Sequence, residues 1–147
     1  MKKTNFKIDI NASKEKVWNV LWNDDTYTQW TAPFGEGSYA QTDWKEGSKV
    51  LFLSSNGEGM NSTIVKKTPN EFMSFKHLGM IKDGIEMPLD DKTREWSGAM
   101  ENYILNEKGG GTELVVEMDI AENFEKYFTD TFPKALEKVK ELAEKIN

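Results

Sequence analysis

The chain contains no cysteine and one histidine, His77. The lack of cysteine excludes disulfide bonds, thiolate metal sites and cysteine nucleophiles. Zinc prefers several cysteine or histidine ligands, so a zinc site is not expected. The acidic pairs Asp24-Asp25 and Asp90-Asp91 lack the loop pattern of a calcium site and are better explained by helix capping and solvation. We therefore predict no metal and no cofactor.

Long apolar runs and basic clusters are also missing. No segment approaches the length of an apolar membrane span, and the N-terminus MKKTNFKIDIN has no apolar signal core. Lys and Arg number 19 against 25 Asp and Glu, for a formal net charge of −6, and no Lys/Arg run would neutralise a row of phosphates. These absences predict a cytoplasmic protein with no membrane span and no nucleic-acid partner.

Large apolar side chains are abundant. Hydrophobic residues make up 37% of the 147 residues, and the aromatic residues include five Trp and eight Phe. This composition is sufficient for one hydrophobic core and too apolar for a disordered chain. Neither an internal repeat nor a low-complexity linker is visible. The sequence therefore predicts a single domain over residues 1–147.

The first part of the chain predicts one strand and two short helices. Apolar and polar residues alternate over 5–10 with the period of a half-buried strand. Ser13 is a favourable helix N-cap, and apolar residues follow it at helical spacing up to Trp22. A second short helix is predicted to reach Trp30, because Pro33 prevents a longer one.

The middle of the chain predicts six antiparallel strands separated by turns. Asn56-Gly57 is the sequence signal of a type I′ hairpin, and Pro69-Asn70 and the glycines at 109–111 mark two more turns. The polar stretch 79–95 is too long for a hairpin loop and is predicted to be a flap or mobile insertion. The strands are expected near 37–43, 48–54, 60–68, 71–78, 96–106 and 112–120.

The C-terminal segment 122–147 predicts a long amphipathic helix with charged residues opposite its apolar stripe. Pro133 lies inside it and is expected to kink it, because proline removes a helical hydrogen bond. The predicted stripe consists of Phe124, Phe128, Phe132, Leu136, Val139, Leu142, Ala143 and Ile146.

The order strand, two short helices, six strands and long helix resembles the SRPBCC superfamily, also called START-like or Bet v 1-like. Within it, the chain is similar to the activator of heat-shock protein 90 ATPase homologues. The matching pieces include Val17-Trp18, Trp30 with Pro33-Phe34, Phe72 to Gly79, Gly111-Thr112-Glu113-Leu114 and Phe128 to Ala143. The resemblance implies an α+β helix-grip fold, in which a curved seven-stranded antiparallel sheet, two short helices and a long C-terminal helix enclose an apolar pocket.

In related proteins such a pocket often holds lipids, sterols, polyketides or other apolar molecules. We therefore expect a small hydrophobic or amphipathic ligand under the long helix, with Pro133 and the 79–95 stretch as the gate. A solid core is the alternative explanation of the same apolar residues. The residues predicted to bind the ligand are Trp30, Phe34, Phe75, His77, Met80, Met87, Tyr103, Met118, Phe128, Phe132 and Leu136.

Two other functions remain open. A cyclase or hydrolase would use His77 with Glu101 or Tyr103, although a structural role for this histidine is the simpler interpretation and an enzyme is not our first choice. A co-chaperone or other protein-interaction domain would bind a chaperone or another protein through a surface patch around Trp30, Phe34 and Trp44. In each case we expect a monomer.

Overall fold

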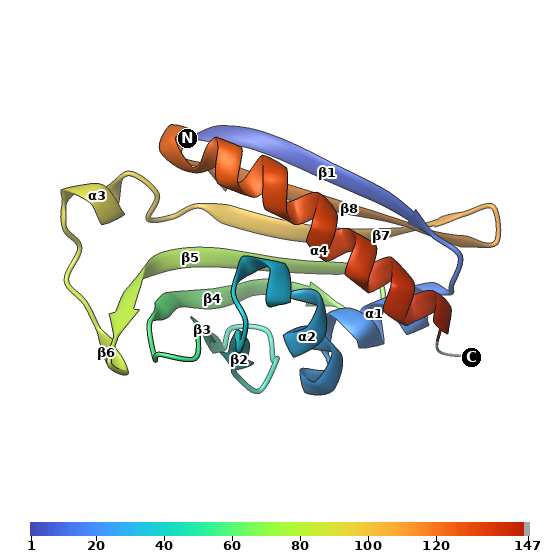
Figure 1. Cartoon of the computed structure of the whole chain (residues 1–147), viewed down its shortest axis with the longest axis horizontal. Coiled ribbons are helices and arrows are strands. Elements are labelled where there is room, and N and C mark those ends of the chain that lie inside the picture. Colours follow the sequence, from blue (N-terminus) through green and yellow to red (C-terminus); the bar gives the residue numbers. More distant parts are fainter. Residues whose placement is uncertain (146–147) are drawn as a thin grey trace.

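The computed structural model describes residues 1–145 and shows one sheet with helices packed against it (Figure 1). The strands are β1 (Lys2–Ile10), β2 (Tyr39–Gln41), β3 (Lys49–Leu53), β4 (Gly59–Thr68), β5 (Phe72–Lys82), β6 (Ile85–Glu86), β7 (Met100–Lys108) and β8 (Gly111–Ile120). The helices are α1 (Lys14–Trp22), α2 (Asp24–Trp30), α3 (Asp91–Arg94) and α4 (Glu125–Lys145), with the 3₁₀ turns η1 (Ala32–Phe34) and η2 (Glu122–Phe124).

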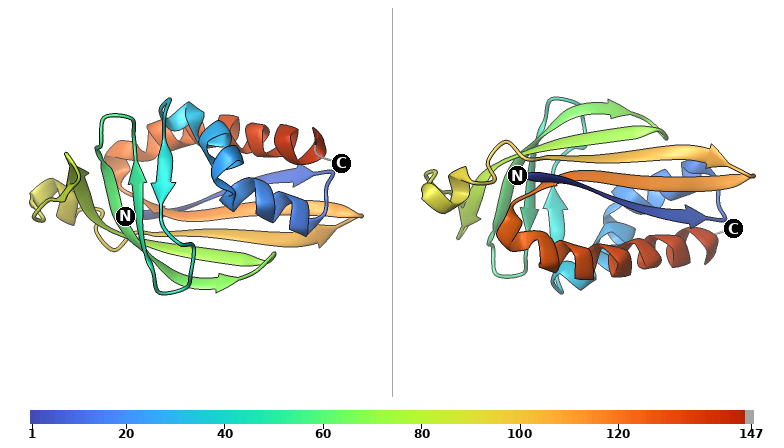
Figure 2. Two further views of the ribbon diagram at one scale, coloured as in Figure 1. Left: turned by 90° about the horizontal axis from the view of Figure 1, so that it is seen from below. Right: turned by 90° about the horizontal axis from the view of Figure 1, so that it is seen from above.

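The strands pair antiparallel in the order β1-β8-β7-β5-β4-β3-β2, and the short β6 pairs with β5 beside this path. Figure 2 shows α4 running along one face of the twisted sheet, with α1 and α2 on the same side. The predicted α+β helix-grip fold is confirmed. Among the described residues, β6 is the one strand that the sequence prediction lacks.

Each of the two short helices begins at a side-chain N-cap, α1 at the predicted Ser13 and α2 at Asn23. The Ser13 hydroxyl accepts a hydrogen bond from the Lys16 amide at 3.2 Å, and the Asn23 side chain accepts one from the Asp25 amide at 3.1 Å. Each bond satisfies an amide that has no partner inside its own helix. Helix α2 ends at Trp30, and η1, which contains Pro33, follows after one residue. The chain then continues to β2 at the end of the strand order.

The long helix α4 packs its apolar stripe on the sheet, where Phe132, Leu136 and Val139 are buried. The helix runs without interruption through Pro133, so the proline does not divide it. The kink stays a prediction. Residues 122–124 form η2 instead of the predicted first helical turn, and Ile146, the last residue of the predicted stripe, lies outside the described residues.

Of the three predicted turns, the type I′ hairpin at Asn56-Gly57 was wrong. The Asn56-Gly57 pair lies in a longer connection between β3 and β4, and only Gly57 has a positive φ, of 82°. A type I′ turn requires positive φ at both central residues. Asp83 and Gly84, with φ of 53° and 75°, meet this requirement and join β5 to β6.

More than half of the predicted insertion at 79–95 belongs to β5, β6 and α3. β5 continues to Lys82 because residues 79–81 pair with β4, and Ile81 is buried. Further along, the Asp90 side chain accepts a hydrogen bond from the Thr93 amide at 2.7 Å and begins the short α3. The next strand starts at Met100 instead of 96, because Gly98 has a φ of 92° that interrupts an extended chain.

No helix within residues 1–145 has the length and apolar composition needed to cross a membrane.

Candidate functional site

A cavity of about 390 Å³ lies between the sheet and the helical segments α2, η1 and α4. Eleven of its 21 lining residues are Phe, Trp or Tyr. Its volume falls in the range of small-molecule sites. The lining residues are Trp22, Tyr27, Trp30, Thr31, Phe34, Ser38, Tyr39, Phe52, Leu53, Ser54, Glu58, Gly59, Met60, Phe75, His77, Met80, Glu101, Tyr103, Tyr127, Phe128 and Phe132.

The aromatic rings of the wall pack on one another. The Trp22 ring centroid is 4.9 Å from that of Tyr103 and 5.3 Å from that of Phe75, with the rings edge to face. On the helix side, the Phe34 and Phe132 ring centroids are 4.9 Å apart, also edge to face. Such contacts hold the rings in defined orientations, so the cavity has a preformed apolar wall.

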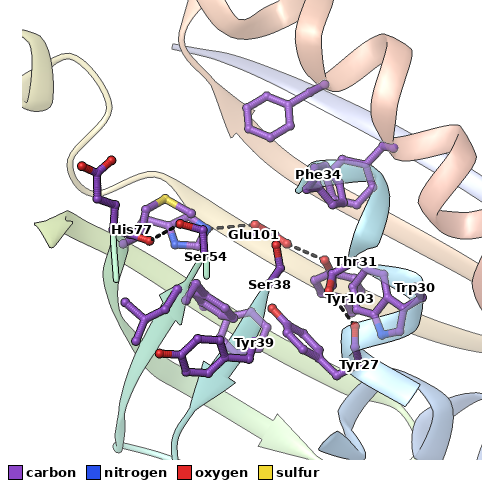
Figure 3. Close-up of a pocket in the computed structure, with 18 of the residues that line it drawn as sticks. Tyr27, Trp30, Thr31, Phe34, Ser38, Tyr39, Ser54, His77, Glu101 and Tyr103 are labelled. Atoms are coloured by element: carbon purple, nitrogen blue, oxygen red, sulfur yellow. Dashed lines mark hydrogen bonds and ion pairs between the residues drawn. The ribbon is translucent and has the colours of Figure 1, made fainter. Parts of the chain in front are cut away.

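A chain of polar side chains borders this wall (Figure 3). His77 on β5 places Nε2 2.9 Å from Glu101 Oε1 on β7, and its Nδ1 lies 2.6 Å from the Ser62 hydroxyl on β4. The Tyr103 hydroxyl donates to the other oxygen of Glu101. The side chains of His77 and Glu101 are only 7% and 15% exposed. A buried carboxylate requires such partners, and here each of its two oxygens has one.

Strand alternation and register explain the placement of this network. Glu101 and Tyr103 are two residues apart on β7 and share a face, as Phe75 and His77 do on β5. In the β4–β5 register Ser62 lies opposite His77, next to an irregularity between Asn61 and Ser62. The network therefore depends on the pairing of three strands.

The environment of the network disfavours further negative charge. Burial, and then the charge and hydrogen bond of Glu101, raise the pKa of the Tyr103 phenol well above its ordinary value of 10.0. Burial and the charge of Glu101 also raise the pKa of Tyr27. Both phenols are therefore neutral at physiological pH, and a phenolate beside Glu101 is opposed by desolvation and repulsion.

Ser62, His77 and Glu101 are linked by hydrogen bonds and have the composition of a hydrolase triad. The serine, however, does not face the cavity where a substrate would bind. A nucleophile must be within reach of the substrate. Ser62 is fully buried and does not line the cavity. Its hydroxyl orients the imidazole ring, and the arrangement as a whole is that of a polar fixture in an apolar wall.

The rim of the cavity is formed by three segments. Residues 31–39 lie on one side, residues 53–60 on another, and the first turns of α4 close the third. The Tyr127 hydroxyl of α4 donates to the Phe34 carbonyl at 3.1 Å and ties two of these segments together. Pro133 does not line the cavity, and Met80 is the only residue of 79–95 that does. The predicted gate stays a prediction.

The structure brings most of the predicted ligand-binding residues to the cavity and leaves three outside. Met118 and Leu136 are buried in the closed part of the core, and Met87 is 40% exposed in the connection that follows β6. Both core residues face the helix–sheet interface, where side chains fill the space. The predicted residues that line the cavity are Trp30, Phe34, Phe75, His77, Met80, Tyr103, Phe128 and Phe132.

Sequence reasoning missed several residues of the wall. Phe52 is two residues after the buried Val50, so alternation along the predicted strand would have found it. Tyr27 is three residues before Trp30 on one helix face. Tyr127 is not part of the apolar stripe and is 45% exposed, so no periodic signal identifies it.

The predicted interaction patch around Trp30, Phe34 and Trp44 is not a surface feature. Trp30 is 2% exposed, while Phe34 and Trp44 are partly buried against the core. The Trp44 ring centroid is 5.3 Å from that of Trp22, inside the same aromatic cluster. These residues were predicted to be exposed because an isolated aromatic residue in a loop gives no sign of what covers it.

Comparison with solved structures shows the same fold in several other proteins. The Aha1 dimer from Colwellia psychrerythraea, studied in solution, is 22% identical, with a TM-score of 0.75 over 98% of this chain and 97% of that chain. A protein from Mesorhizobium loti is 14% identical, with a TM-score of 0.78 over 99% of both chains. A protein from Nitrosomonas europaea is 12% identical, with a TM-score of 0.74 over 99% of this chain and 96% of that one.

A search of curated proteins found no match. The family model described as "Activator of Hsp90 ATPase homolog 1-like protein" matches residues 11–144, which is nearly the whole chain. With the helix-grip fold and the order of its elements, this match shows that the chain belongs to the Activator of Hsp90 ATPase homolog 1-like family of the SRPBCC superfamily.

Proposed function

We propose that the chain binds a small hydrophobic or amphipathic molecule in the cavity under α4. Membership of this family supports a ligand-binding or co-chaperone-like domain. The observation that carries the ligand-binding proposal is the cavity of about 390 Å³, with its aromatic wall and its buried His77, Glu101 and Tyr103 network. An apolar wall with a few convergent polar groups is the usual form of a small-molecule site.

The chemistry of the wall favours binding over a protein-interaction role. The rings of Trp30, Phe34 and Trp44 are engaged with other aromatic side chains and form no exposed patch for a chaperone. A ligand in the cavity would contact the same rings from the inside. It would bury its apolar body against them and satisfy a polar group at Glu101 or at the rim hydroxyls.

A neutral fluorescent probe tests this proposal. N-phenyl-1-naphthylamine should bind with a saturable fluorescence increase, because apolar burial shields it from water. Met80→Trp, which places a larger side chain on the cavity wall, should weaken this binding by roughly tenfold, the scale of about 1.4 kcal/mol of lost contact. Titration by fluorescence and by calorimetry would measure both affinities.

The matched control is Met87→Trp, because Met87 lies just beyond β6 and does not line the cavity. This variant should bind the probe like the original chain. Equal loss of binding in the two variants, or no saturable binding by any neutral apolar compound, would contradict the proposed function.

A further inference from the structure

The charges around the cavity are of one sign. Among the described residues that line it, none is Lys or Arg, whereas Glu58 lies at the rim and Glu101 within. His77 is the only basic side chain there, and both of its ring nitrogens are engaged by Glu101 and Ser62. A carboxylate or phosphate head group would therefore find no cation available to pair with it.

Five hydroxyl groups of the lining donate their protons to acceptors within the protein. Thr31 donates to the Tyr27 carbonyl at 2.6 Å, Ser38 to the Gly35 carbonyl at 2.5 Å, and Ser54 to the Glu58 carbonyl at 3.0 Å. Tyr103 and Tyr127 also donate, to Glu101 and to the Phe34 carbonyl. Once a hydroxyl proton is used, only the oxygen lone pairs remain for a ligand.

Three side-chain donors of the wall have no partner within residues 1–145: the Trp22 indole N–H and the hydroxyls of Tyr27 and Tyr39. The Trp22 indole N–H has less than 1 Å² of accessible surface, so a ligand does not reach it. The two tyrosine hydroxyls can each donate or accept. The lining as a whole thus offers mainly hydrogen-bond acceptors to a ligand.

Glu101 is the strongest of these acceptors. A carboxylate has about four lone-pair sites, and the structure fills two of them with His77 and Tyr103. Glu101 lies opposite Phe75 in the β5–β7 register and lines the same cavity as the packed rings of Trp22, Phe75 and Tyr103. Aromatic faces attract cations, and a desolvated carboxylate does so more strongly. Anions are disfavoured at the same place. The pKa of the Tyr103 phenol is raised there, which means that burial and Glu101 oppose formation of the phenolate anion.

We propose that the cavity selects ligands that join an apolar, ring-sized body to a positively charged, hydrogen-bond-donating head, that is, hydrophobic amines, with the ammonium group at Glu101. This inference rests on the proposed function and narrows it to one class of ligand. Anionic amphiphiles such as fatty acids are disfavoured by the same geometry.

The test compares three probes that share one ring system: 1-naphthylmethylamine, 1-naphthalenemethanol and 1-naphthoic acid. At pH 7 they are cationic, neutral and anionic. Calorimetric titration should rank them amine, alcohol, acid, with the amine roughly tenfold tighter than the alcohol, the gain expected from a charge-assisted hydrogen bond. Glu101→Gln should remove most of this preference and leave the affinity for the alcohol within roughly threefold.

The control is Glu107→Gln, which makes the same change on the same strand at an exposed position away from the cavity. It should preserve the ranking, and circular dichroism would establish that both variants are folded. The ranking of the original chain decides the matter even if Glu101→Gln does not fold.

The outcomes separate the two proposals. Binding of the alcohol with no gain for the amine, or a gain that persists in Glu101→Gln, would overturn the inference and leave the proposed function standing. If none of the three probes binds, both are wrong. The predicted ranking, together with its loss in Glu101→Gln alone, supports both.

Discussion

Tyr103 connects the cavity to the stability of the protein at high pH. Its phenol is buried, and its pKa is raised above 10.0 first by burial and then by Glu101. Below pH 10 the phenol is protonated in both folded and unfolded chains. Above pH 10 the unfolded chain loses this proton and the folded chain keeps it, so the free energy of unfolding falls as pH rises.

We therefore expect Tyr103→Phe to be less sensitive to alkaline pH than the original chain. The variant loses the hydrogen bond to Glu101 and should be less stable at pH 9, but the difference should shrink by about 1.4 kcal/mol per pH unit above 10. Urea unfolding at pH 9, 10 and 11 measures this. Tyr39→Phe, at an exposed tyrosine, is the control for the loss of a hydroxyl group. If the free energies of unfolding of Tyr103→Phe and of the original chain change with pH in parallel, the expectation is wrong.

At the scale of elements, α4 and η1 both border the cavity, and we expect access to depend on them. The hydrogen bond from Tyr127 to the Phe34 carbonyl and the contacts of the Phe34 ring with Phe128 and Phe132 hold these two elements together. Gly35 and Gly37 follow at once, and Gly37 has a φ of 80° that favours glycine. The segment after η1 is thus the place where the rim can open.

Tyr127→Phe should loosen this rim without disturbing the wall. Loss of one partly exposed hydrogen bond should speed the dissociation of N-phenyl-1-naphthylamine by roughly threefold to tenfold and its association by a similar factor, with little change in affinity. Stopped-flow fluorescence measures both rates. Tyr39→Phe is the matched control, because Tyr39 lines the cavity but is not part of the hydrogen bond that links α4 to η1. Unchanged rates in Tyr127→Phe would show that entry occurs elsewhere.

The sequence predicted elements more reliably than it predicted the site, because elements depend on local periodicity. Caps such as Ser13 and the stripe of α4 are visible along the chain. The pairing of His77 with Glu101 was expected and is found, but the contact of His77 with Ser62 was not expected, since it depends on the β4–β5 register and its irregularity. Met118 illustrates the same limit: alternation places it toward the helix, yet only the packing of α4 decides whether that position is cavity or core.

At the scale of the whole molecule, the ends of the sheet bear on self-association. β1 and β2 are the two ends of the strand order. β1 carries Lys2, Lys3 and Lys7, and β2 has only three residues. Charged and short edge strands resist pairing with another chain.

We therefore expect a monomer, whereas the relative from Colwellia psychrerythraea is described as a dimer. Light scattering coupled to size-exclusion chromatography should give the mass of one chain over a range of protein concentrations. A mass of two chains that persists on dilution would contradict this expectation. In that case the Lys3→Val variant, which removes a charge from the β1 edge, would test whether the edge takes part.

The single histidine has a practical consequence for the study of this protein. Because His77 is the only imidazole of the chain and lies in the cavity wall, nuclear magnetic resonance will show one set of histidine ring signals, and they come from the site itself. The hydrogen bonds of the ring to Ser62 and Glu101 make those signals sensitive to anything that touches Glu101. The ring signals of His77 should therefore change when a ligand fills the cavity, and observing them requires no probe and no mutation.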